Sequence, residues 1–145
     1  MLSKIALNLL ARREHSRFEL QHKLSAKGFT SEDIAKLLQK LDTQGLQSDT
    51  RFVENYINMR RSRGFGPLRI KCELKTRGIN QETIANFLDE NDVAWVDLAK
   101  IVYDRKFGKK TPQNSRAKAQ QMKYLYYKGF TSDQIRKVVA HDKNM

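Results

Sequence analysis

Hydrophobic positions along this chain follow a pattern that occurs three times. Three seven-residue segments align without gaps: 24–30, 74–80 and 125–131. Each begins with a leucine and ends with a basic residue, a glycine, an apolar residue, and a threonine or asparagine. The glycines of these segments are 50 and then 51 residues apart. An isoleucine lies ten positions after each leucine, and a pair of apolar residues begins three positions later. A period of this length predicts a tandem array of structural units.

Each repeated segment has the features of a corner between two helices. The basic residue before each glycine suits the negative end of a helix dipole. The glycines themselves can adopt the left-handed conformation that ends a helix; they are Gly28, Gly78 and Gly129. Thr30, Asn80 and Thr131 then occupy the position where the next helix needs an N-cap. Asp33 and Gln134 follow their caps by three residues, and Gln134 is the better partner for a capping box.

A further amphipathic helix is predicted ahead of each corner, because apolar residues recur there at a spacing close to 3.6. Those residues are Leu2, Ala6, Leu9 and Leu10; Phe52, Val53, Tyr56, Ile57 and Met59; and Trp95, Leu98, Ala99, Val102 and Tyr103. Asp49 and Asp92 are the predicted N-caps of the second and third of these helices.

The predicted fold class is therefore all-α, built from three tandem helix-turn-helix-like repeats of three helices each. The repeats are expected over 1–44, 45–90 and 91–145, and the third contains a longer loop over 108–115. Because the apolar stripe within one repeat is narrow, neighbouring repeats must share contacts. This predicts an elongated and curved array.

Motifs for catalysis, metal binding and membrane insertion are missing from the sequence. The single cysteine, Cys72, excludes an internal disulfide and a Cys-pair zinc site. His15, His22 and His141 are isolated, which favours surface or capping roles over metal ligation. Phosphate-loop, nucleophile-elbow and metalloprotease motifs are absent, so we expect no enzyme, no cofactor and no metal. No stretch approaches the ~18 apolar residues of a membrane span, and the N-terminus lacks a signal-peptide pattern, so we expect a cytoplasmic protein with no membrane partner.

Charge is distributed in blocks. The chain has 28 Lys and Arg against 16 Asp and Glu, a net charge of +12. Residues 1–59 have a net charge of +2, and residues 60–77, with seven basic and one acidic residue, have +6. Residues 78–99, with five acidic and no basic residues, have −5, whereas residues 100–145 have +9. A solvated helical surface is one interpretation, but the one-sided excess favours an anionic partner, above all nucleic acid.

Nine residues within the basic blocks are candidate contacts to that partner. Tyr126 is included because a large aromatic stands where the other two repeats have Ser25 and Thr76. The complete set is Arg60, Arg63, Arg69, Lys75, Lys109, Lys110, Arg116, Lys123 and Tyr126.

The order of these motifs resembles a known family. The first repeat has a Leu-x-x-Lys-Gly-Phe corner, and the third ends with Lys-Gly-Phe before an isoleucine. The middle repeat carries the run Phe52, Tyr56, Arg60, Arg63-Gly64, Pro67, Ile70, Glu73-Leu74 and Arg77-Gly78-Ile79. With its threefold register, this pattern resembles the bacterial regulatory RecX family over nearly the whole chain. Tyr127 departs from it, at a position where an arginine or another polar residue could serve.

The resemblance implies a modulator, usually an inhibitor, of the RecA recombinase. Such a protein is expected to lie along the RecA–DNA filament and to limit strand exchange, ATP hydrolysis and co-protease activity. We expect it to be a monomer that contacts RecA and binds single- or double-stranded DNA without sequence specificity. Two alternatives stay open on the residues alone: a free-standing DNA-binding protein of the helix-turn-helix kind, and a helical adaptor for an acidic protein.

Overall fold

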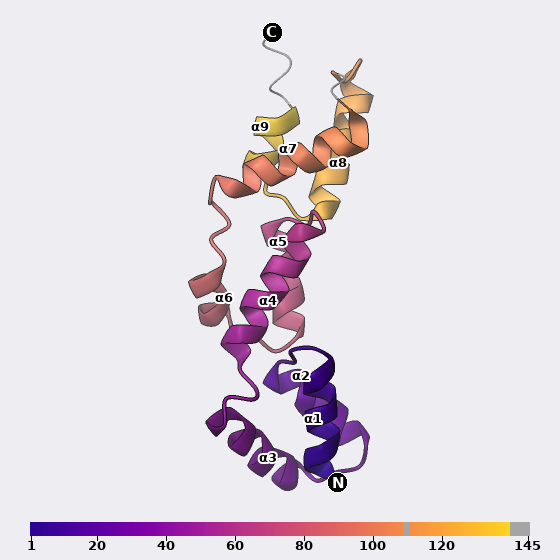
Figure 1. Cartoon of the computed structure of the whole chain (residues 1–145). Coiled ribbons are helices and arrows are strands. Elements are labelled where there is room, and N and C mark those ends of the chain that lie inside the picture. The colour runs from indigo at the N-terminus through magenta and orange to yellow at the C-terminus, as the bar shows by residue number, and fades with distance from the viewer. Residues whose placement is uncertain (109–110, 140–145) are drawn as a thin grey trace. The chain divides into compact units, whose positions relative to one another are not determined.

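The computed structural model describes residues 1–108 and 111–139, and this part of the chain forms nine α-helices and no strands (Figure 1). The helices are α1 (Leu2–Arg12), α2 (Arg17–Ala26), α3 (Ser31–Thr43), α4 (Asp49–Ser62), α5 (Pro67–Thr76), α6 (Gln81–Phe87), α7 (Ala94–Phe107), α8 (Ser115–Lys128) and α9 (Ser132–Val139). The predicted all-α fold with three helices in each repeat is confirmed. Three residues named in the sequence predictions lie outside the described residues, namely Lys109, Lys110 and His141.

The chain divides into two compact units, and the division passes through the middle repeat. Unit 1 comprises Met1–Tyr56 and Leu74–Phe87, and unit 2 comprises Ile57–Glu73 and Leu88–Met145. Helices α4 and α5 therefore each contribute residues to both units. The repeat boundaries expected from the sequence stay a prediction.

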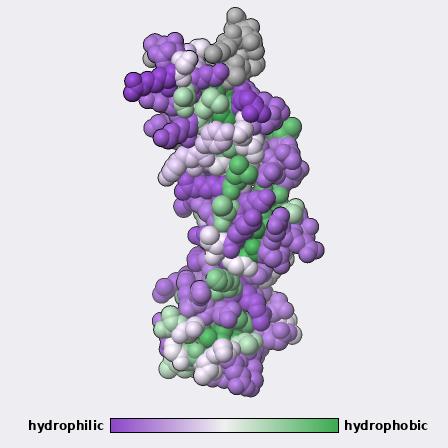
Figure 2. Space-filling view, turned by 180° about the vertical axis from the view of Figure 1, so that it is seen from behind, coloured by the Kyte–Doolittle hydropathy of each residue, from purple (hydrophilic) through white to green (hydrophobic). Residues whose placement is uncertain are grey.

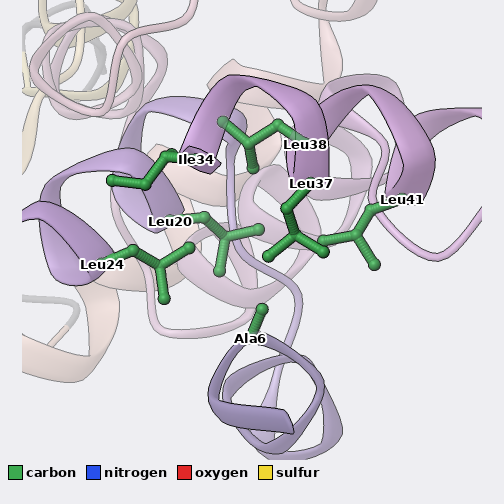
Figure 3. Packing of buried hydrophobic residues seen from close by; sticks show 7 residues of the cluster. All are labelled: Ala6, Leu20, Leu24, Ile34, Leu37, Leu38 and Leu41. Atoms are coloured by element: carbon green, nitrogen blue, oxygen red, sulfur yellow. The ribbon is translucent and has the colours of Figure 1, made fainter. Parts of the chain in front are cut away.

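The core of unit 1 is centred on α1, α2 and α3. Seven buried side chains from these helices point toward one another in Figure 3: Ala6, Leu20, Leu24, Ile34, Leu37, Leu38 and Leu41. Leu2, Leu9 and Leu10 pack around them, so the stripe predicted for the first helix does face the core. Full burial of one leucine or isoleucine side chain contributes about 1.5–3 kcal/mol, which makes this cluster the main source of stability for the three helices.

The second glycine corner packs on the first turn of α2 within unit 1. Ser16 caps α2 through a reciprocal capping box with Glu19, in which both hydrogen bonds measure 3.1 Å. The Ser16 hydroxyl also donates to the carbonyl oxygen of Arg77 at 2.8 Å. Gly78 follows directly, and a Cβ added there would lie 2.2 Å from the Cβ of Phe18. The corner can approach α2 this closely only because residue 78 has no side chain.

Unit 2 has its own core, formed where α7, α8 and α9 pack against one another (Figure 1). Its buried apolar residues on these helices and their third glycine corner are Trp95, Ala99, Val102, Tyr103, Leu125, Phe130, Ile135, Val138 and Val139. Two buried amides are also satisfied. The Tyr103 hydroxyl donates to Oε1 of Gln121 at 2.7 Å, and the side chain of Gln134 donates to the Glu90 carbonyl at 2.6 Å.

The three predicted glycine corners are confirmed, with φ of +94° at Gly28, +80° at Gly78 and +104° at Gly129. The corners differ in packing, however. A Cβ on Gly28 would meet nothing within 4 Å, whereas one on Gly129 would lie 2.4 Å from the Cβ of Arg69. The first corner therefore needs glycine only for its backbone conformation, while the other two also need it for space.

Three predicted N-caps are confirmed. The Thr30 hydroxyl accepts from the backbone N–H of Asp33 at 3.2 Å. The side-chain oxygen of Asn80 accepts from the backbone N–H of Thr83 at 2.8 Å. Thr131 and Gln134 form a full capping box, with hydrogen bonds of 3.2 and 2.9 Å. As expected, Gln134 completes its box, whereas Asp33 does not return a hydrogen bond to Thr30.

The two aspartate caps were predicted wrongly. Asp49 is the first residue of α4, and the preceding Ser48 is the cap, since its hydroxyl accepts from the backbone N–H of Arg51 at 3.2 Å. The carboxylate of Asp49 instead accepts from the backbone N–H of Arg17 at 2.8 Å. Asp92 accepts from the N–H of Ala94 at 2.9 Å, but α7 begins one residue later than a cap at Asp92 requires.

His15 is neither a surface residue nor a cap. It is only 1% exposed. Its Nε2 lies 2.8 Å from the Nζ of Lys23, and its Nδ1 lies 3.1 Å from the carbonyl oxygen of Arg13. An ammonium can only donate and a carbonyl can only accept, so the ring is neutral with its proton on Nδ1. Burial is the main reason that the pKa of His15 is lowered.

Hydrophilic residues cover most of the face shown in Figure 2, with hydrophobic residues visible between them. This agrees with a sequence in which 30% of residues are charged and 39% hydrophobic. Cys72, on α5, is exposed. Over residues 1–108 and 111–139, no helix has both the length and the apolar character required to cross a membrane.

Candidate nucleic-acid interface

One carboxylate in unit 2 holds two of the predicted contact residues. Arg60, near the end of α4, donates through Nε and Nη2 to the two oxygens of Glu73, both at 2.9 Å. Arg69 lies one turn before Glu73 on α5 and donates through Nε to the same carboxylate at 3.2 Å. The side chains of Arg60 and Glu73 are only 14% and 20% exposed. Planar guanidinium groups match a carboxylate in this two-bond geometry, so the pair fixes α4 against α5 at this point.

Three cations surround the ring of Phe65 in the loop between α4 and α5. The guanidinium carbons of Arg60 and Arg69 lie 3.9 and 4.4 Å from the ring centroid, and Nζ of Lys128 lies 4.1 Å away. Each cation is attracted to the negative face of the ring. Burial, together with the nearby Arg69 and Arg60, lowers the pKa of Lys128. Burial is the larger cause of this shift, and the two arginines add to it.

The third glycine corner brings α8 into this cluster. The N–H of Gly66 donates to the carbonyl oxygen of Lys128 at 2.7 Å, and the N–H of Leu68 donates to that of Gly129 at 2.9 Å. Arg69 donates to the carbonyl oxygen of Tyr127 at 3.2 Å. The start of α5 is therefore joined to the end of α8 by backbone hydrogen bonds, which accounts for the close approach at Gly129.

A shallow cavity of about 210 Å³ opens beside this cluster in unit 2. Its lining residues come from the turn after α4, from α7 and from α8: Arg63, Gly64, Val102, Arg105, Lys106, Tyr124 and Lys128. Four of the seven are cationic, and none is acidic. Two of the cations lie near the ring of Tyr124, with Nζ of Lys106 at 5.3 Å and Nζ of Lys128 at 6.0 Å from its centroid. We refer to this cavity as the basic pocket.

The predicted contact residues of the first basic block are distributed among different environments. Arg60 and Arg69 belong to the Glu73 network, and Arg63 lines the basic pocket. Lys75 is exposed near the end of α5, in the part of that helix that belongs to unit 1.

The predicted contacts on α8 lie at its surface. Arg116 in its first turn and Lys123 further along are both exposed. Tyr126 is 49% exposed, and its hydroxyl is hydrogen-bonded to that of Ser132. Lys109 and Lys110 are outside the described residues.

Three pocket cations were in the predicted basic blocks but were not singled out, namely Arg105, Lys106 and Lys128. The spacing of Tyr124 and Lys128, four residues apart on one helix face, is a signal that could have marked that part of the pocket. Nothing in the sequence shows that the turn after α4 and helix α7 contribute to the pocket. Among the described residues, no three His, Cys, Asp or Glu side chains gather closely enough to hold a metal ion.

The fold is that of a tandem three-helix repeat protein, and its unit 2 carries a cationic pocket. Family models for the first, second and third three-helix domains of RecX match residues 4–41, 48–88 and 94–139. The chain belongs to the RecX family.

Similar proteins support this assignment over nearly the full length. The regulatory protein RecX of Pseudomonas putida is 40% identical over 139 residues, which cover 96% of this chain and 89% of that protein. The regulatory protein RecX of Legionella pneumophila is also 40% identical over 139 residues, covering 96% and 93% of the two chains. The crystal structure of RecX from Lactobacillus salivarius has a TM-score of 0.83 over 99% of this chain and 96% of that chain; at 21% identity it shows a likeness of fold. The names of these relatives describe regulators.

Proposed function

We propose that this protein is a non-enzymatic regulator of homologous recombination that binds the RecA–DNA filament and restrains strand exchange, ATP hydrolysis and co-protease activity. It acts as a monomer in the bacterial cytoplasm. Membership of the RecX family is the observation that carries the proposal. The cation-rich surface of unit 2 supports it, because a filament that contains DNA presents closely spaced phosphates, to which arginine and lysine bind.

The contacts proposed for the filament are those predicted from the sequence. The exposed ones, such as Arg116 and Lys123, can meet phosphates or acidic side chains of RecA directly. Arg60 and Arg69 act mainly by holding the loop around Phe65, because both are bonded to Glu73. The remaining proposed contacts are Arg63, Lys75, Lys109, Lys110 and Tyr126.

The test is the rate of ATP hydrolysis by RecA on single-stranded DNA, with this protein added below the RecA concentration. We expect the rate to fall as protein is added, and an unchanged rate at every ratio would contradict the proposal.

Paired charge reversals locate the contact surface. Arg116→Glu combined with Lys123→Glu should weaken inhibition, whereas Lys4→Glu with Lys40→Glu, an equal change of charge at exposed sites in unit 1, should not. An acidic residue in the first turn of α8 suits the helix dipole, so the first variant should stay folded. Equal effects of both variants would show that net charge, rather than this surface, determines binding.

The helix-turn-helix alternative is not favoured by the third helix of each repeat. In α3, Lys36 lies 3.6 Å from Glu32, and in α9 both Arg136 and Lys137 lie within 4 Å of Asp133, at 3.7 and 3.1 Å. Helix α6 contains no basic residue. A helix that reads a major groove needs arginine or amide side chains available to base edges. Tight, sequence-selective duplex binding without RecA at about 0.15 M salt would nevertheless establish that alternative.

A further inference from the structure

The basic pocket is an anion site by its chemistry. Within the described part of the chain, none of its four cations lies within 4 Å of a carboxylate: Arg63, Arg105, Lys106 and Lys128. Cations on protein surfaces are commonly interspersed with acidic groups, which neutralise them. Four converging cations around one cavity repel one another, and a bound anion removes that repulsion.

The state of Lys128 supports this interpretation. Its pKa is lowered by burial and by the two arginines around Phe65. An anion placed beside Lys128 favours the charged ammonium, so binding and protonation reinforce each other. The backbone of the pocket wall is also fixed, because the carbonyl oxygen of Lys128 accepts from the N–H of Gly66. The backbone at Lys128 is therefore held in place on this side of the pocket.

An exposed aromatic ring stands next to the pocket on α8. Tyr127 lies three residues after Tyr124, so the two side chains are neighbours on the helix surface, about 5–6 Å apart at Cβ. The guanidinium of Arg69 lies 4.9 Å from the centroid of the Tyr127 ring, and the residue is nevertheless 69% exposed. An exposed ring of this kind, backed by an arginine, is a platform on which an unpaired base can stack.

We propose that the basic pocket binds one backbone phosphate of single-stranded DNA while Tyr127 stacks against an adjacent base. The site specifies the DNA-contacting part of the proposed function and rests on it for its biological setting. A duplex keeps its bases paired and stacked, so it can use the pocket but not Tyr127. An acidic peptide can likewise bring a carboxylate to the pocket but offers no base to the ring.

The direct test measures binding of the full-length protein alone to a fluorescein-labelled oligothymidylate of about 12 nucleotides, a length within the range of single-strand sites. Binding is followed by fluorescence anisotropy at several salt concentrations between about 50 and 200 mM. Tyr127→Ala should weaken binding roughly 5- to 150-fold, whereas Tyr127→Phe, which keeps the ring, should bind as the parent protein does. Equal binding by all three proteins would overturn the stacking part of the proposal.

The pocket is tested by the salt dependence of the same binding reaction. Lys106→Gln should reduce the slope of log K against log salt by about 0.7, the value for loss of one phosphate contact on a single strand. Lys100→Gln is the matched control, because Lys100 is an exposed lysine of the same helix that does not line the pocket. The same slope for both variants would overturn the pocket assignment.

Competitors distinguish other sources of the anion. Inorganic phosphate should displace the oligonucleotide only at concentrations far above that of the oligonucleotide itself, and poly-L-glutamate should compete no better. Displacement by sub-millimolar phosphate would mean a free-anion site, and preferential displacement by poly-L-glutamate would mean a site for an acidic protein; either result overturns the proposal.

Failure of this proposal is separable from failure of the proposed function. A protein that inhibits RecA but shows no effect of Tyr127 or Lys106 substitution on oligonucleotide binding regulates RecA without this site. A protein that binds the oligonucleotide as described but leaves RecA unaffected has the site without the regulatory role.

Discussion

Replacement of Gly78 by alanine should destabilise the protein more than replacement of Gly28, although both glycines end a helix in the left-handed conformation. The shared cost is the positive φ, +80° at Gly78 and +94° at Gly28, which is about 1–2 kcal/mol for a residue with a Cβ. Only Gly78 has an additional cost, because its new Cβ would lie 2.2 Å from the Cβ of Phe18 and 2.5 Å from the first ring carbon. A forced shift of packed groups costs about 1–3 kcal/mol, so Gly78→Ala should lose about 2–5 kcal/mol in total.

Urea unfolding followed by far-UV circular dichroism measures both losses on the full-length chain. Gly28→Ala should lose only about 1–2 kcal/mol, because a Cβ there meets nothing within 4 Å. The difference between the two variants isolates the packing of the second corner on α2. Equal losses would refute the argument that close approach, in addition to backbone conformation, requires glycine at residue 78.

Three further predictions concern side chains whose partners the structure identifies. Glu73→Gln should cost about 1–3 kcal/mol in the free energy of unfolding, because it removes the charge that holds Arg60 and Arg69, and urea denaturation of the variant checks this. Ser16→Ala should cost about 1–2 kcal/mol through loss of the α2 cap, and the matched change Ser3→Ala, in the first turn of α1, should cost less in the same assay. The pKa of His15 is lowered below 6.5, so the unfolded chain binds a proton that the folded chain excludes, and stability should fall as the pH decreases through 6.5. Denaturation midpoints measured on either side of that pH should converge in His15→Gln, and an unchanged pH dependence in that variant would contradict the assignment.

The sequence predicted best the features that depend on a few adjacent residues. A glycine corner and its N-cap are specified within about seven positions, so Gly28, Thr30 and Thr131 could be placed correctly from their spacing alone. Ser48 and Asp49 show the limit of this approach. Both residue types are good N-caps and they are neighbours. Which of them caps α4 depended on Arg17, whose backbone N–H donates to the Asp49 carboxylate from a distant part of unit 1.

Features that depend on residues distant in sequence could not be predicted. Arg60 looked like a surface contact because a count of charges along the sequence does not show which side chains meet in space. Its partner, the carboxylate of Glu73, lies thirteen residues away on the next helix. His15 looked like a surface residue because it precedes α2, where helical spacing does not place its side chain relative to Lys23, eight residues further along the chain. The basic pocket is formed by α7, α8 and the turn after α4, and only the packing of unit 2 brings them together.

The discontinuity of unit 1 has a consequence for synthesis on the ribosome. The core of α1, α2 and α3 is complete once Thr43 has left the exit tunnel, but Ser16 and Phe18 acquire their contacts with the second glycine corner only when that corner has also emerged. Gly78 follows Thr43 by 35 residues. At about 5–20 residues per second, this interval lasts about 2–7 s. For those seconds the nascent chain has a finished helical core, while the surface of α2 at Ser16 and Phe18 is open to water.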